Sequence, residues 1–185
     1  MNNLYIICGR SGSGKDSVSD KLCKEQELKK VNSYTTREKR ENEEGTHIFV
    51  TTEEFDKIRN DLVAYTFFNG NEYGATNKQV NKSDIYILDK KGVEYFKENY
   101  DNYKPYKIIY LDVPEQMCRT RMIKRGDSKE DANERVINDR IEFEGIEKLA
   151  DIVISNVYFL SCYCDLWEYI RNCENDFRKG VNKNK

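Results

Sequence analysis

The sequence predicts an α/β protein built on a parallel sheet of about five strands that is flanked by helices. Short apolar runs alternate along the chain with longer segments of helical periodicity, which is the pattern of strands joined by crossover helices. In addition, a glycine-rich turn at residues 9–15 separates the first apolar run from the first helical segment. With 185 residues, the chain is long enough for one domain with a sizeable core.

The first half of the chain is expected to contain one core strand, a helix and a small lobe. Thr51 is followed three residues later by Glu54, a capping-box spacing that predicts a helix through Ile58. Residues 62–68 and those around Tyr73 predict two antiparallel strands joined by an Asn-Gly-Asn turn. The other elements expected in this half are a strand at 4–8, a helix at 17–28 and a strand at 31–34.

The second half is expected to complete the parallel sheet. Two apolar strands, at 85–88 and 108–111, each end at an aspartate, Asp89 and Asp112. Pro114 then opens a helix, because a residue in the first helical turn needs no N–H group. The remaining elements expected are a charged helix at 130–149, a strand at 152–154 and an amphipathic helix at 159–177.

Composition excludes several classes of protein. The 31 Lys and Arg residues against 33 Asp and Glu give a net charge of −2, which argues against a surface dedicated to nucleic acid or membrane. The first apolar run lacks a basic flank and is far shorter than the ~20 residues that cross a bilayer. The six cysteines form no Cys-x-x-Cys pair, and one histidine offers little for a zinc site. We expect a cytoplasmic protein with reduced thiols, either a monomer or a homodimer.

The turn at 9–15 reads Gly-Arg-Ser-Gly-Ser-Gly-Lys and lies between a predicted strand and a predicted helix, as a phosphate-binding loop requires. Its glycines allow backbone N–H groups to surround phosphate oxygens, and the helix N-terminus adds partial positive charge. Lys15 would reach the β- and γ-phosphates, so the sequence predicts ATP as a phosphoryl donor. The expected donor contacts are Gly9, Arg10, Ser11, Gly12, Ser13, Gly14, Lys15, Asp16 and Ser17.

A magnesium ion is expected with the donor, but the sequence leaves its ligand open. The position after the lysine normally holds Ser or Thr, and here it holds Asp16, with Ser17 next. The metal could therefore take Ser17, or meet Asp16 directly or through water, since both offer oxygen ligands. Asp89, at the end of a predicted strand, is the third candidate, although such aspartates also cap helices.

Residues 33–43 read Ser-Tyr-Thr-Thr-Arg-Glu-Lys-Arg-Glu-Asn-Glu. They resemble the Ser-x-Thr-Thr-Arg-x-x-Arg-x-x-Glu element with which guanylate kinases grip the phosphate of the acceptor. The resemblance implies that Arg37 and Arg40 bind this phosphate, as paired guanidinium groups do well. Residues 69–74 are similar to the family's Gly-x-x-Tyr-Gly, which implies the same role for Tyr73.

Residues 121–126, Arg-Met-Ile-Lys-Arg-Gly, resemble the junction between a helix and the lid in this family. The resemblance implies that Arg121 contacts the donor and that Arg125 and Arg135 are catalytic, since phosphoryl transfer depends on converging cations. It covers the chain from about residue 4 to the closing helix and implies a P-loop kinase. The implied parts are a core (1–32, 82–124 and 141–178), an acceptor lobe (33–81) and a lid (125–140).

Two positions depart from the family. Guanylate kinases read guanine with a glutamate and a Ser or Thr where this chain has Ala64 and Ala75, and only Ser33 remains. The resemblance thus implies a nucleoside monophosphate kinase with altered base choice. Ribose 1,5-bisphosphate phosphokinase is an alternative, because it resembles this chain at Gly-Ser-Gly-Lys-Asp-Ser and at His47. A non-catalytic guanylate-kinase-like binding module is another, although it would be expected to lack Lys15 or the lid arginines.

Overall fold

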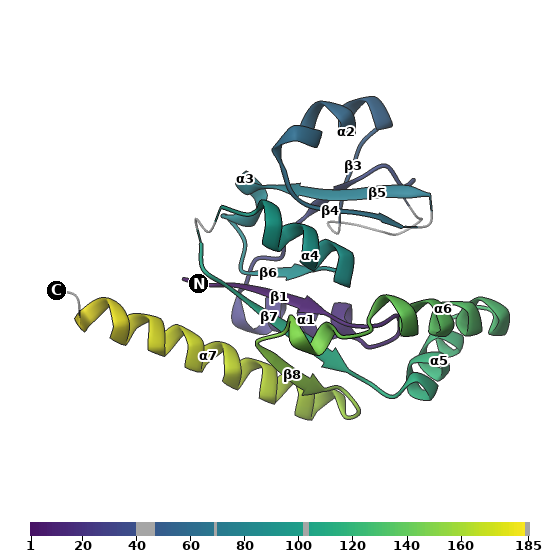
Figure 1. Cartoon of the computed structure of the whole chain (residues 1–185). Coiled ribbons are helices and arrows are strands. Elements are labelled where there is room, and N and C mark those ends of the chain that lie inside the picture. Colours follow the sequence, from purple (N-terminus) through teal and green to yellow (C-terminus); the bar gives the residue numbers. More distant parts are fainter. Residues whose placement is uncertain (40–46, 69, 102–103, 184–185) are drawn as a thin grey trace.

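The computed structural model describes residues 1–39, 47–68, 70–101 and 104–183, which form two sheets with helices packed around them (Figure 1). This confirms the α/β prediction. The strands are β1 (Leu4–Cys8), β2 (Ser33–Thr35), β3 (His47–Phe49), β4 (Leu62–Phe68), β5 (Asn71–Thr76), β6 (Ile85–Ile87), β7 (Tyr106–Asp112) and β8 (Ile152–Ser155). The helices are α1 (Lys15–Gln26), α2 (Thr52–Ile58), α3 (Asn77–Val80), α4 (Lys90–Asn99), α5 (Glu115–Lys124), α6 (Lys129–Glu142) and α7 (Phe159–Lys183), with 3-10 turns η1 (Arg59–Asp61) and η2 (Ile146–Lys148).

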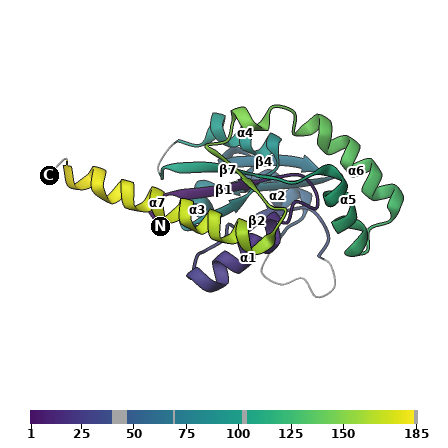
Figure 2. The ribbon, with the colours of Figure 1, turned by 90° about the horizontal axis from the view of Figure 1, so that it is seen from below.

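The main sheet is parallel, with the strand order β6-β1-β7-β8. Its central strand β1 is apolar on both faces because both are covered. Leu4 and Ile6 pack with α4 and the second sheet, whereas Tyr5 and Ile7 pack with α1 and α7 (Figure 1). The carboxyl ends of parallel strands meet at one edge, and α5 and α6 lie next to each other there (Figure 2).

The strand expected at 31–34 does not join the main sheet. The chain meets that sheet just before this segment, at an isolated bridge between Lys30 and Ile85, and the N–H of Val31 then donates to the Ile85 carbonyl at 2.8 Å. From Ser33 onward, β2 pairs with β3 and β5 instead. The main sheet therefore has four strands among the described residues, and a second sheet of order β3-β2-β5-β4 lies beside it.

The register of the second sheet places particular side chains on one face. Thr35 of β2 lies opposite Tyr73 of β5, which lies opposite Thr66 of β4. We call these three residues the polar row. Two positions from Tyr73 along β5 and two positions from Thr66 along β4, Ala75 lies opposite Ala64. Because alternate residues of a strand share a face, the polar row and this alanine pair lie side by side on the same face of the sheet.

Several local predictions are confirmed, and the boundaries of three helices differ, the first of them being α1, which was expected at 17–28 and spans Lys15–Gln26. The Thr51–Glu54 capping box is present, and β4 and β5 form the expected antiparallel pair, although Asn69 of their turn lies outside the described residues. The helix expected at 130–149 stops at Glu142, because Gly145 adopts a positive φ of 75° that turns the chain into η2. The closing helix α7 runs six residues past its expected end at 177, to Lys183.

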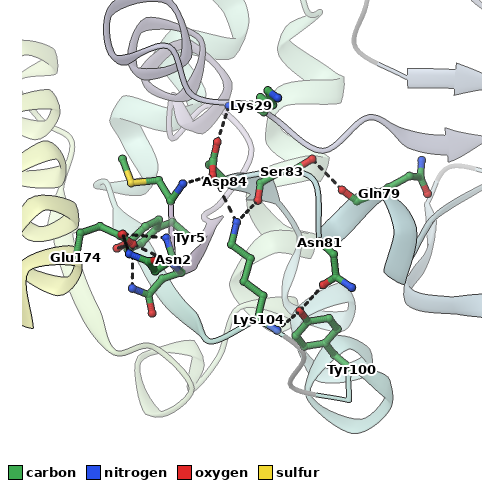
Figure 3. A network of polar contacts seen from close by, with 12 residues as sticks. Asn2, Tyr5, Lys29, Gln79, Asn81, Ser83, Asp84, Tyr100, Lys104 and Glu174 are labelled. Carbon is green, nitrogen blue, oxygen red and sulfur yellow. Dashed lines mark hydrogen bonds and ion pairs between the residues drawn. The ribbon is translucent and has the colours of Figure 1, made fainter. Parts of the chain in front are cut away.

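A polar network ties the amino ends of the strands to α7 (Figure 3), at the edge of the main sheet that lies away from α5 and α6 (Figure 1). Glu174, which is 6% exposed, accepts hydrogen bonds from the backbone N–H groups of Asn2 and Asn3 at 2.9 and 3.0 Å and from the hydroxyl of Tyr5 at 2.9 Å. Burial alone would raise the pKa of Glu174, but these hydrogen bonds outweigh it and lower the pKa to about 2. The ionised carboxylate therefore fastens α7 to β1.

All six cysteines are free thiols. None of the helices in the described ranges is long and apolar enough to cross a membrane.

Candidate functional site

A cavity of about 560 Å³ opens at the carboxyl edge of the main sheet. Its wall combines the loop between β1 and α1 with side chains from α5, α6 and the β8–α7 turn. The structure thus brings together most of the predicted donor, metal and lid residues, which lie far apart in the sequence. Those on the wall are Gly9, Ser11, Gly12, Gly14, Lys15, Asp16, Ser17, Asp89, Arg121, Arg125 and Arg135.

The loop is held in shape by close contacts behind it. Gly12 and Gly14 have φ values of 75° and 82°, a region that L side chains rarely adopt. A methyl group on Gly12 would lie 2.5 Å from the carbonyl oxygen of Cys118, and one on Gly14 would lie 2.7 Å from Nδ2 of Asn156. Ser13 is fully buried and does not reach the cavity, while its carbonyl accepts a 2.7 Å hydrogen bond from Asn156. Glycine is therefore required at both positions.

Arg121 braces this loop. Its Nη2 donates to the carbonyl of Asn156 at 2.7 Å, and Nη1 lies 3.4 and 3.5 Å from the carbonyls of Ser13 and Gly12. The guanidinium thereby joins the loop to the turn that leads into α7. It lies on the cavity wall, as predicted for a donor contact, but in this conformation its N–H groups serve backbone carbonyls.

Lys15, the lysine of the loop, is held loosely. Its Nζ lies 3.5 Å from the carbonyl oxygen of Arg10, close to the limit of a hydrogen bond. This contact uses the backbone of Arg10, whose side chain does not line the cavity. The ammonium group is thus available to a phosphate at little cost.

The three candidate magnesium ligands differ in their surroundings. Asp16 and Ser17 are exposed at the start of α1, on the cavity wall. Asp89 caps α4, since Oδ1 accepts from the N–H of Gly92 at 2.6 Å, and Oδ2 accepts from Thr66 Oγ1 at 2.7 Å. Within the described part of the chain, no group of three or more His, Cys, Asp or Glu residues could hold a metal ion. The oxygens present fit Mg²⁺ bound jointly by one or two side chains and the donor phosphates.

The two lid arginines share one carboxylate. Arg125 makes a bidentate pair with Asp127 at 3.1 and 2.8 Å, and Nη1 of Arg135 lies 3.9 Å from the same carboxylate. The hydrogen bonds that Arg125 donates to Asp127, together with the charges of Asp127 and Asp16, raise the pKa of Arg125. The Arg125 guanidinium therefore carries its positive charge at the cavity.

The predicted acceptor residues gather around His47. Ser33 Oγ lies 2.9 Å from Nδ1 of His47, whose ring meets the ring of Tyr73 edge-on at 5.7 Å. The guanidinium of Arg37 lies 5.4 Å above the ring of Phe49, on the same strand as His47. Three of the four predicted acceptor residues are thus close together on the second sheet. The fourth, Arg40, lies outside the described residues.

The two positions that the resemblance assigns to the reading of guanine are closed in this chain. Ala64 and Ala75 are both fully buried, and they pack into the core between the two sheets. This part of the face therefore offers no side-chain donor or acceptor to a base.

Sequence reasoning missed two carboxylates on the cavity wall, Asp139 and Glu142 of α6. Asp139 is 6% exposed, and its Oδ2 accepts a 2.6 Å hydrogen bond from the N–H of Ser11. Burial and the neighbouring charge of Asp89 raise the pKa of Glu142. Both residues follow Arg135 at helical spacing, four and seven positions on, so the face of α6 that carries this arginine would have revealed them.

A glycine-rich loop between β1 and α1, its lysine, and arginines from two further elements around one cavity define a P-loop phosphotransferase. Comparison with known proteins agrees. The model of the guanylate kinase family matches residues 1–173. The chain belongs to the guanylate kinase family, whose members are ATP-dependent phosphotransferases.

Individual relatives give the same result. The guanylate kinase of Clostridium tetani is 31% identical over 180 residues, covering 81% of this chain and 84% of its own. That of Mannheimia succiniciproducens is 30% identical over 186 residues, covering 92% and 88%. The crystal structure of guanylate kinase from Anaplasma phagocytophilum superposes with a TM-score of 0.68 over 92% of this chain and 85% of its own, at 21% identity, which shows the fold. The predictions of family, fold class and enzyme class are therefore confirmed.

Proposed function

We propose that this chain transfers the γ-phosphoryl group of ATP to the phosphate of a nucleoside monophosphate, with Mg²⁺ and with weak selection for guanine. The observation that carries the proposal is the gathering of Lys15, Arg125 and Arg135 around one cavity of about 560 Å³ behind a phosphate-binding loop. Because the relatives are named guanylate kinases, GMP is the first acceptor to test.

On the donor side, the loop N–H groups and Lys15 bind and orient the phosphates. Arg125 and Arg135 leave Asp127 and stabilise the charge on the transferred group, which is where such enzymes gain most of their rate. Bound Mg²⁺ supplies further neutralisation of the phosphate charge, and Asp16, Ser17 and Asp89 are the residues that would hold it.

On the acceptor side, Arg37 and Tyr73 bind the acceptor phosphate, and Arg40 joins them. Ser33 faces the base. Closure of the acceptor lobe and the lid over the core excludes water from the phosphoryl transfer. The assigned parts are a core of residues 1–32, 82–124 and 141–178, an acceptor lobe of residues 33–81 and a lid of residues 125–140.

Weak base selection follows from Ala64 and Ala75. A site that hydrogen-bonds a base rejects other bases because its own polar groups would otherwise be left unpaired. Two fully buried alanines impose no such penalty. The reduced thiols fit a cytoplasmic protein, and we expect a monomer or a homodimer, which light scattering would distinguish.

Specificity constants measured under one condition test the proposal. The acceptors are GMP, dGMP, AMP, CMP, UMP, dTMP and ribose 1,5-bisphosphate. We expect turnover of GMP and of at least one other nucleotide within about a hundredfold, since each lost contact is worth on the order of 1 kcal/mol. A thousandfold preference for GMP would contradict the relaxed base choice. Turnover of the sugar bisphosphate alone would favour a phosphokinase of that substrate, and no turnover at all would contradict catalysis.

A further inference from the structure

A carboxylate from the lid helix lies against the phosphate-binding loop. Asp139, in the last turn of α6, approaches the N–H of Ser11 to 2.6 Å and is 6% exposed. Ser11 belongs to the loop whose N–H groups receive the donor phosphates. An anionic oxygen of the protein therefore already uses an N–H group that the loop would offer to an anionic ligand.

The lid arginines are turned to a different partner at the same time. Arg125 and Arg135 both meet Asp127, at 2.8 and 3.9 Å, in the segment that leads into α6. In this conformation the lid thus presents a negative group to the loop, while its two arginines are directed toward Asp127 within the lid. The arrangement is the reverse of what a bound triphosphate requires.

We propose that Asp139 is an internal competitor of the donor phosphates, which holds the loop in the nucleotide-free protein and must withdraw when the nucleotide binds. This inference rests on the proposed function, since it takes the loop to be the donor site. Two anions a few ångströms apart in a partly desolvated cavity repel strongly, so phosphate and Asp139 cannot share the loop. Nucleotide binding is thereby coupled to a shift of α6.

The attachment of α6 to its neighbour permits such a shift. α6 is tied to α5 by the pair of Arg140 with Glu115, at 3.1 and 2.6 Å, and by a hydrogen bond of Arg119 to Asn133 at 2.5 Å. Asn133 and Arg140 are exposed and Glu115 and Arg119 are half-buried, and pairs so close to solvent contribute little to stability. The buried residues of α6 are Ala132 and Asp139. The hydrogen bond between Asp139 and Ser11 therefore links α6 to the phosphate-binding loop.

The expected size of the effect follows from competition. If the loop is free of Asp139 for only a fraction of the time, the apparent dissociation constant exceeds the intrinsic one by the inverse of that fraction. A hydrogen bond to a charged group shifts such an equilibrium by roughly ten- to a hundredfold. Removing Asp139 is therefore expected to tighten binding of ATP by about tenfold.

Calorimetric titration of ATP and ADP in the absence of acceptor tests this on the full chain. The variants are Asp139→Ala and Asp139→Asn, and the control is Glu134→Ala, which removes an exposed carboxylate from the same helix. We expect Asp139→Ala to bind about tenfold more tightly and Glu134→Ala to match the wild type within about twofold. Asp139→Asn should lie between them, because its amide oxygen still accepts a hydrogen bond but carries no charge.

The amide resonance of Ser11 provides a readout that does not depend on affinity. In ¹⁵N–¹H spectra this peak should differ between wild type and Asp139→Asn without ligand and coincide when both are saturated with ADP. Unchanged or weaker nucleotide binding by both variants, or a Ser11 peak that differs equally in both states, would overturn the inference while leaving the proposed function intact. Conversely, tighter ATP binding without turnover of any nucleoside monophosphate would contradict the proposed function alone.

Discussion

Thr66 Oγ1 lies 2.7 Å from Asp89 Oδ2, and this hydrogen bond joins the two halves of the site. Thr66 belongs to the polar row, directly opposite Tyr73, on the face of the second sheet that we call the acceptor face because it carries Tyr73. Asp89 lies on the wall of the donor cavity and caps α4 through the N–H of Gly92. This hydrogen bond therefore adds a polar link between the second sheet and the donor cavity to the apolar packing of β4 against α4.

Thr66→Val should weaken the alignment of the two halves, because valine keeps the shape of the side chain but removes the hydroxyl that bonds Asp89. We expect the specificity constant for the acceptor to fall by about tenfold, since a hydrogen bond to a carboxylate is lost. The affinity for ATP alone should change little. Steady-state kinetics compares this variant with Thr52→Val, an exposed position of the same lobe. Equal kinetics in the two variants would mean that the hydroxyl does not align the sites.

Lys15→Ala should lower kcat by at least a hundredfold, because a cation that acts on the transferred group is removed. The fold should survive, since within the described part of the chain this ammonium makes one hydrogen bond, the 3.5 Å contact to the carbonyl of Arg10. Turnover and circular dichroism check both points. The control is Lys24→Ala, an exposed lysine of the same helix. Retention of a tenth of the wild-type rate would show that Lys15 is not essential.

The magnesium requirement should respond more to Asp16→Asn than to Ser17→Ala. A carboxylate binds this hard cation more strongly than a hydroxyl does, and both residues lie on the cavity wall. Activity titrated against Mg²⁺ at saturating ATP should show a higher half-saturating concentration in the Asp16 variant. The reverse order would identify Ser17 as the ligand.

Arg37→Ala should weaken binding of the acceptor and leave the affinity for ATP unchanged. The guanidinium lies above Phe49, close to the Ser33–His47 pair and away from the donor cavity. Loss of its charge-assisted hydrogen bonds corresponds to roughly ten- to a hundredfold in the specificity constant for the acceptor. Calorimetry with ATP should give the wild-type dissociation constant. The control is Arg178→Ala, at an exposed position of α7. Weaker ATP binding by the Arg37 variant would contradict the assignment of Arg37 to the acceptor phosphate.

Glu174→Gln should lower stability in a pH-dependent way. The pKa of Glu174 is about 2 in the folded protein against an ordinary 4.5, so its contribution is complete above pH 4.5 and is lost as the pH falls toward 2. At pH 7 the variant should melt roughly 4–8 °C below the wild type, and the difference should shrink below pH 4.5. Glu168→Gln, exposed on the same helix, should show no such difference. A constant gap from pH 7 to 3 would exclude the carboxylate as the cause.

The sequence predicted those parts of the molecule that depend on neighbouring residues. The loop at 9–15, the capping box at Thr51 and the β4–β5 hairpin all arise from local chemistry, and the first is a recognisable motif. It did not predict that β2 would leave the main sheet, because a short run of alternating residues fits either sheet. It also missed the contact of Asp139 with Ser11, which joins residues 128 positions apart.

The length of the turn between β4 and β5 sets the register of these two strands, and so decides which side chains lie on the acceptor face. Tyr73 and Thr66 lie opposite each other only because the hairpin pairs Phe68 with Asn71. Since side chains alternate between faces, one residue inserted into this turn would send Tyr73 and Ala75 to the far side of the sheet. Gly70, with a φ of 75° and no atoms within 4 Å of an added methyl group, tolerates a bulkier residue at the cost of local strain alone. Variation among homologues should therefore change the composition of this turn far more readily than its length.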